Sequence, residues 1–134
     1  MNIKTYLLGI LFLLPLSASA QQGHPLAGIW LGDWGAGATD RNQVVVELIW
    51  TDTSLSGNIN PGYPDEAIIA SGSLDSANGW KVRIDAKGTD ENGKAFMTIL
   101  EGQLDESTLG SANRTMSGTW TQAGVSGSFN LRRE

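Results

Sequence analysis

The sequence predicts an all-β protein, an eight-stranded antiparallel up-and-down β-barrel that follows a cleaved signal peptide. Two observations predict this fold. Beyond residue 20, apolar and polar residues alternate with a period of two in eight successive segments, the pattern of an antiparallel sheet with one face in water. Short connections rich in Gly, Asn, Asp and Ser separate these segments and suit hairpins. Closing such a sheet into a barrel removes its edges.

Residues 1–20 have the three parts of a secretory signal peptide. Lys4 gives a basic start, residues 6–16 form an apolar run, and Ala18 and Ala20 supply an A-x-A cleavage site. The apolar run is about half as long as a membrane-spanning helix. We therefore expect cleavage after Ala20 and no stable membrane insertion. The remaining domain, residues 21–134, would be periplasmic or extracellular. The alternative is an uncleaved N-terminal anchor.

Eight strands are expected within the mature domain. Residues 80–87 alternate most cleanly, with Trp80, Val82 and Ile84 on one face and Lys81 and Arg83 on the other. The full set of expected strands is 27–34, 42–51, 55–60, 67–74, 80–87, 95–104, 115–121 and 125–133.

A Gly-x-apolar triplet recurs in six of these strands, at 28–30, 57–59, 72–74, 102–104, 118–120 and 127–129. Residues two apart lie on one face of a strand, so each Gly should face inward beside its apolar partner. Gly weakens a strand unless the chain bends or another group approaches closely. A tightly coiled barrel wall requires both. The alternative is a flat sheet with Gly-rich loops.

The two ends of the barrel should differ. In a meander, the connections 35–41 and 61–66 fall at the same end, and they are the richest in Gly or Pro. We name this end the open end. Trp30, Trp50 and Trp80 fall toward the opposite, closed end, where we expect them to plug the barrel as core residues.

Composition limits the partners of the domain. Without Lys4, it carries eight basic and 14 acidic residues. Nucleic acids and anionic membranes need a basic patch, so neither is an expected partner. The absence of Cys excludes disulfides and attachment of lipid to an N-terminal Cys.

The chain resembles the calycin superfamily, the meander barrels that include lipocalins, avidins and bacterial metalloprotease inhibitors. Gly28-Ile29-Trp30 matches the Gly-x-Trp that opens the first strand in that superfamily. A basic residue late in its last strand usually packs over this Trp. Arg133 has the matching inward parity and could stack on Trp30 as a cation–π contact.

The avidin branch is the most similar in layout. Trp80 falls where avidins place a biotin-stacking Trp, and Thr98 could match a hydroxyl position. The resemblance fails at Gly32, Ile59 and Leu100, where avidins have polar or aromatic ligand contacts. A buried polar ligand needs hydrogen-bonding partners in the protein. Most of these partners are absent here, so we do not expect biotin binding.

The expected function is binding of a small, mainly apolar ligand at the open end. Eight strands leave room for side chains or for one small ligand. This expectation fails if Trp34, Phe96, Met116 and Trp120 fill the lumen. The candidate ligand contacts are Trp34, Tyr63, Trp80, Phe96 and Trp120.

The alternative function is a solid barrel that binds another protein. The resemblance to the superfamily's protease inhibitors implies an N-terminal segment that enters a protease cleft. Here that segment would be residues 21–25, which lack the Ser-rich start expected of such inhibitors.

The sequence offers little catalytic chemistry. Nucleophilic catalysis needs a base beside a Ser or Cys, and the only His is His24, in an N-terminal tail that we expect to be flexible. No His or carboxylate cluster has metal-ligand spacing. Residues 90–93 suit a hairpin turn better than a calcium loop. We therefore expect a protein that is not an enzyme and holds no metal or cofactor.

Overall fold

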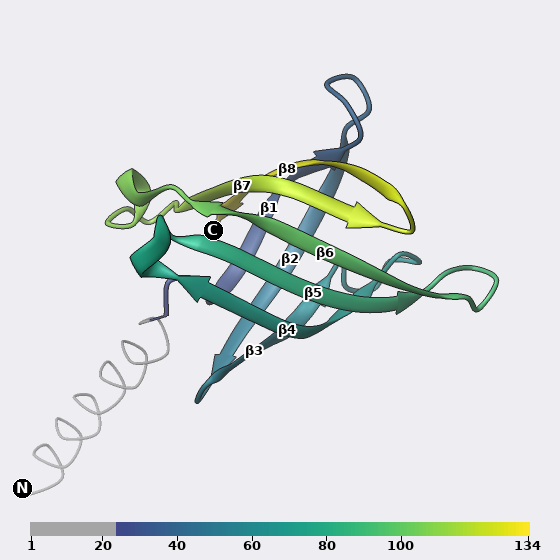
Figure 1. The fold of residues 1–134 in the computed structure, drawn as a ribbon, viewed down its shortest axis with the longest axis horizontal. Coiled ribbons are helices and arrows are strands. Elements are labelled where there is room, and N and C mark those ends of the chain that lie inside the picture. Colours follow the sequence, from purple (N-terminus) through teal and green to yellow (C-terminus); the bar gives the residue numbers. More distant parts are fainter. Residues whose placement is uncertain (1–23) are drawn as a thin grey trace, which may run out of the picture.

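The computed structural model describes residues 24–134. It is a closed barrel in which each strand pairs antiparallel with its neighbours in sequence and β1 pairs with β8 (Figure 1). The predicted eight-stranded up-and-down barrel is confirmed. The predicted signal peptide, residues 1–20, lies outside the described residues. The strands are β1 (Gly28–Gly35), β2 (Asn42–Thr51), β3 (Ser54–Ile59), β4 (Ala67–Asp75), β5 (Lys81–Thr89), β6 (Ala95–Leu104), β7 (Thr115–Gln122) and β8 (Val125–Arg133).

The strand boundaries differ little from the expected ones. The clearest difference is at Trp80, which was expected to begin a strand but precedes β5. Gly79 and Trp80 both have positive φ angles, 70° and 58°, after the short 3-10 helix η1 (Ser76–Asn78). The turn therefore needs the left-handed conformation that Gly adopts freely and a bulky residue adopts rarely.

The interior of the barrel is filled with apolar side chains. Trp30, Phe129 and Leu100 are at most 2% exposed, and burial of such a side chain stabilises the fold by about 1.5–3 kcal/mol. The buried apolar residues are Leu26, Trp30, Val44, Val46, Leu48, Leu55, Ile59, Ala67, Ile69, Val82, Ile84, Ala86, Leu100, Leu104, Met116, Phe129 and Leu131. In a chain without Cys, this core and the closed backbone ladder stabilise the barrel.

Close approach of neighbouring strands explains the recurring Gly residues. Gly102 of β6 pairs with Gly118 of β7. A Cβ atom at Gly118 would overlap the carbonyl oxygen of Glu101, and one at Gly102 would lie 3.0 Å from the Phe129 ring. The wall is thus coiled too tightly here for side chains, as expected from the Gly-x-apolar pattern.

The closed end is plugged by Trp30. Its indole Nε1 donates a hydrogen bond to the Leu26 carbonyl at 2.8 Å. Arg133 lies opposite Trp30 in the β1–β8 ladder, as its parity predicts. The Arg133 guanidinium donates to the Ala27 carbonyl at 3.3 Å, and the Arg133 methylene groups lie over Gly28. Among the described residues, the expected cation–π stacking of Arg133 on Trp30 is not found.

Trp50 departs from its expected place in the core. It is 37% exposed and stacks on His24, with the ring centroids 3.9 Å apart. Trp50 lies near the end of β2, opposite the buried Leu55 of β3, and its ring packs on His24 at the edge of the core. Trp80, by contrast, packs against the core.

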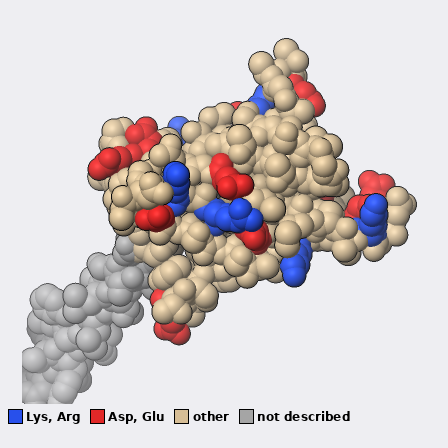
Figure 2. Space-filling model, viewed as in Figure 1, with Lys and Arg blue, Asp and Glu red and all other residues tan. Residues whose placement is uncertain are grey.

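The outer face carries charges of both signs together with exposed apolar side chains such as Ile49 and Ile68. Figure 2 shows acidic and basic side chains interspersed on one side of the barrel. Among residues 24–134, no helix is long and apolar enough to cross a membrane.

The close contact between β6 and β7 predicts that two Gly→Ala substitutions change the free energy of unfolding by very different amounts. Gly118→Ala should lower the free energy of unfolding by about 1–3 kcal/mol or more, because its methyl group overlaps backbone atoms. Gly110→Ala is the control, because a Cβ there meets nothing within 4 Å. Urea unfolding measures both. Equal stabilities for the two variants would contradict the close approach.

Candidate functional site

A cavity of about 340 Å³ opens at the end of the barrel that the sequence identifies as open. Its lining comes from the ends of β1 and β7, the starts of β2 and β8, and the β1–β2, β3–β4 and β7–β8 connections. This volume lies near the lower limit for small-molecule sites. We name this cavity the mouth pocket.

Trp34 and Trp120 form the apolar part of the mouth pocket. Their ring centroids are 5.4 Å apart and their planes are inclined by 46°. The Trp120 indole Nε1 donates to the Ser128 carbonyl at 3.1 Å. Both rings pack against the core while remaining partly exposed, so they connect the filled interior to the mouth.

Gly127 allows these two Trp residues to meet. They come from β7 and β1, which flank β8, and Gly127 of β8 lies opposite Trp120 in the ladder. A Cβ atom at Gly127 would lie 2.9 Å from Trp120 Nε1 and would overlap the Gly35 carbonyl oxygen. The missing side chain thus leaves room for the Trp120 indole beside β1.

Gln122 is held in position by a buried hydroxyl. Thr98 is 1% exposed, and its Oγ1 donates to Gln122 Oε1 at 2.8 Å. Because the amide oxygen is engaged, the Gln122 amide group offers its N–H donors at the mouth pocket. A polar group of this kind orients a ligand that is held mainly by apolar contact.

Asp40 and Asp65 add negative charge to the lining. Asp65 Oδ2 accepts a hydrogen bond from Asn60 Nδ2 at 3.0 Å, which fixes its carboxylate. No Lys or Arg side chain forms an ion pair with either carboxylate in the described part of the chain.

Arg41 lies next to Asp40 in sequence and binds at the edge of the mouth pocket, where it donates to the carbonyl of the lining residue Gly35 at 3.4 Å. It is paired with Asp33 and also donates to Ser128 Oγ at 2.9 Å. The hydrogen bond from Arg41 holds the pKa of Asp33 below its ordinary value; the charge of Arg41 and a bond from Asn130 add to this, while desolvation opposes it. Arg41 thus fastens the β1–β2 connection to β8.

The five predicted ligand contacts lie in four places. Trp34 and Trp120 share the mouth pocket. Tyr63 is 63% exposed and lines a neighbouring depression of about 170 Å³ that shares Asp65 with the mouth pocket. Phe96 packs against the core beside Gly88. Trp80 precedes β5, at the closed end.

The lumen itself is occupied by side chains. Met116 is buried in the core, and Trp34, Phe96 and Trp120 pack against it. Filling of the lumen by these four residues is the condition on which the expected open-end binding fails, so a ligand held within the lumen is ruled out. The open space left at this end of the barrel therefore lies at the mouth, above the core.

Asp40, Asp65 and Gln122 were not predicted as site residues from the sequence. Asp40 and Asp65 lie in irregular connections, where no periodicity tells which way a side chain points. Gln122 shares the inward parity of Trp120 and could have been found from that signal. Thr98 was noted only through the avidin resemblance, and its partner was not predicted.

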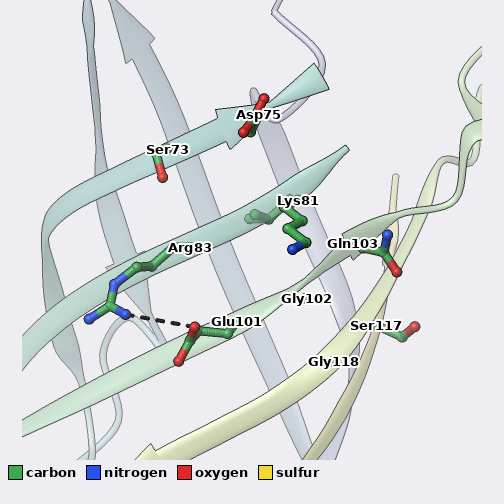
Figure 3. A pocket seen from close by; sticks show the side chains of 10 residues that line it. Ser73, Asp75, Lys81, Arg83, Glu101, Gly102, Gln103, Ser117 and Gly118 are labelled. Atoms are coloured by element: carbon green, nitrogen blue, oxygen red, sulfur yellow. Dashed lines mark ion pairs between the residues drawn. The ribbon is translucent and has the colours of Figure 1, made fainter. Parts of the chain in front are cut away.

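A second depression, of about 530 Å³, lies on the outer wall across β4 to β7 (Figure 3). Its lining is mostly polar, and of its four charged residues Arg83 and Glu101 form an ion pair. Arg83 contacts Asp85 at 3.0 Å and Glu101 at 3.7 Å. It is wider than the mouth pocket, but it is a groove between solvated side chains with no aromatic lining.

The start of the described chain is fastened to the closed end. His24 stacks on Trp50, its Nδ1 accepts a hydrogen bond from the Leu26 amide at 3.1 Å, and Leu26 is 1% exposed. The Pro25 carbonyl accepts a bond from Arg114 at 3.1 Å. The expectation that His24 lies in a flexible tail is therefore wrong, because these contacts hold it.

The described residues bring together few groups suited to catalysis or metal binding. Residues 24–134 contain no group of three His, Asp or Glu side chains that could hold a metal ion. The Asp90 carboxylate accepts hydrogen bonds from the amides of Asn92 and Lys94, both at 2.9 Å. As expected, this segment is a hairpin turn.

Comparison of the chain with protein-family models, with curated proteins and with solved structures gives no match. The eight-stranded antiparallel barrel is compatible with a calycin-like fold.

The His24 contacts predict that stability depends on pH near neutrality. Partial burial lowers the pKa of His24 from 6.5, so the folded protein favours the neutral ring. The contribution is present above about pH 6.5 and is lost as the pH falls from there through the lowered pKa. The loss should be less than about 1 kcal/mol, because water screens this partly exposed ring.

Thermal unfolding at about pH 7.5 and about pH 5 measures this effect. The control is His24→Phe, which keeps an aromatic ring against Trp50 but does not titrate. Subtracting its pH dependence removes the contribution of the carboxylates. Identical pH profiles for the two proteins would contradict the account.

Proposed function

We propose that the protein is an exported, non-enzymatic barrel of the calycin superfamily that binds a small, mainly apolar ligand at its open end. The observation that carries this proposal is the mouth pocket between Trp34 and Trp120. Aromatic rings contribute large apolar contact areas to binding. The remainder of the lumen is packed, so the ligand would rest on the core rather than within it.

The geometry of the mouth pocket supports a preformed site. Trp120 is fixed through Ser128 and Gln122 through Thr98. Groups that are already ordered cost less conformational entropy when a ligand binds. This arrangement suits a ligand with an apolar body and one or two polar atoms.

The proposed export and superfamily rest on sequence. Residues 1–20 have the composition of a signal peptide. Gly28-Ile29-Trp30 with an opposing Arg133 is the local pattern that resembles calycins. A small-ligand barrel outside the cytoplasm is consistent with both features.

The alternative of a protease inhibitor has weaker support. Within the segment 21–25 that would enter a protease cleft, His24 and Pro25 are held against the barrel. Releasing them would cost those contacts before any contact with a protease forms. We therefore favour the small-ligand function.

The test uses 1-hexanol as a neutral, mainly apolar probe. Titration into ¹⁵N-labelled protein should shift the indole N–H resonances of Trp34 and Trp120 in a saturable way. Replacing either ring with Ala should weaken binding by about tenfold, since loss of a buried aromatic contact costs about 1–2 kcal/mol.

Trp50→Ala is the matched control. It removes an equally large ring from the closed end and should leave the affinity for hexanol unchanged. Shifts confined to the closed end, or no saturable shift at any indole, would contradict binding at the mouth pocket.

A further inference from the structure

We propose that the ligand of the mouth pocket is a small organic cation, whose ammonium group lies against the indoles of Trp34 and Trp120 and near the carboxylates of Asp40 and Asp65. This inference rests on the proposed function and adds the charge of the ligand.

The aromatic pair provides the first argument. The planes of Trp34 and Trp120 are inclined by 46° at a centroid distance of 5.4 Å, so the two rings form an angled wall of the mouth pocket. The face of a Trp ring carries the negative part of its quadrupole and attracts cations more strongly than Tyr or Phe does.

The charge of the lining provides the second argument. Asp40 and Asp65 both line the mouth pocket, and its lining contains no Lys or Arg. The adjacent cation, Arg41, is paired with Asp33 and bonded to Ser128. Within residues 24–134, the negative charge at the mouth pocket is therefore not neutralised by an ion pair.

The polar side chains that line the mouth pocket also favour a positively charged ligand. Asp65 offers a carboxylate that is fixed by Asn60, and Asn42 and Asp40 also line the mouth pocket. An anionic ligand would face two carboxylates, whereas an ammonium group would be attracted by the carboxylates and by any indole face that it contacts. The Gln122 amide N–H groups remain available for a polar atom elsewhere on the ligand.

Three probes of equal chain length test the inference: hexylammonium, 1-hexanol and hexanoate. The amine is protonated at neutral pH, like a Lys side chain, so the three differ mainly in charge at one end. Binding is followed by the indole resonances of Trp34 and Trp120. Hexylammonium should bind about tenfold more tightly than hexanol, and hexanoate should bind most weakly.

The matched variants keep side-chain size and change only charge. In the double variant Asp40→Asn, Asp65→Asn, the preference for hexylammonium over hexanol should fall about threefold or more, because the affinity for the charged probe falls more than the affinity for the neutral one. Asp52→Asn is the control, because Asp52 lies in the β2–β3 turn at the closed end and should leave the preference unchanged.

The outcomes separate this inference from the proposed function. If hexanol or hexanoate binds as tightly as hexylammonium, the cation inference is wrong and the apolar site remains. Loss of the preference in Asp52→Asn would show a general effect of net charge and would also overturn it. If none of the probes shifts the indoles of Trp34 and Trp120, the proposed function itself is wrong.

Discussion

Closure of the sheet, by pairing of β1 with β8, is the constraint on which the other features depend. It places Arg133 opposite Trp30 at one end and Phe129 opposite Trp34 at the other. It also removes every free edge, which an open sheet would expose to other chains. Closure at this size requires a tightly coiled wall, and Gly102 and Gly118 meet where that wall allows no side chain.

The same constraint creates the mouth pocket. Trp34 and Trp120 are 86 residues apart in the sequence, and they meet because β8 lies between their strands and carries Gly127 at the level of the rings. Below them the lumen is packed with apolar side chains. This core stabilises the barrel, and the partly exposed layer above it is the site that we propose for a ligand.

Much of the fold could be predicted from period-two alternation, because alternation identifies both the strands and their inward faces. The inward positions of Trp30, Phe129 and Arg133 follow from it. Alternation says less at strand ends, where Trp50 passes beyond the core and Trp80 enters a left-handed turn. The position of such a side chain depends on tertiary contacts that alternation does not reveal, such as the stacking of His24 on Trp50.

The candidate site could be predicted only in part. Trp34 and Trp120 were found because strand parity and strand direction place them inward and near the open end. Their contact could not be predicted, since it depends on the register between β8 and its two neighbours. Asp40 and Asp65 lie in irregular connections whose course is determined by particular hydrogen bonds, such as that between Asn60 and Asp65.

The most direct test is native mass spectrometry of the protein purified from its native source. The account predicts a barrel that carries the added mass of one small molecule, which is lost from the variant Trp34→Ala, Trp120→Ala. A partner polypeptide bound in its place, or a small molecule retained by that variant, would contradict binding at the mouth pocket.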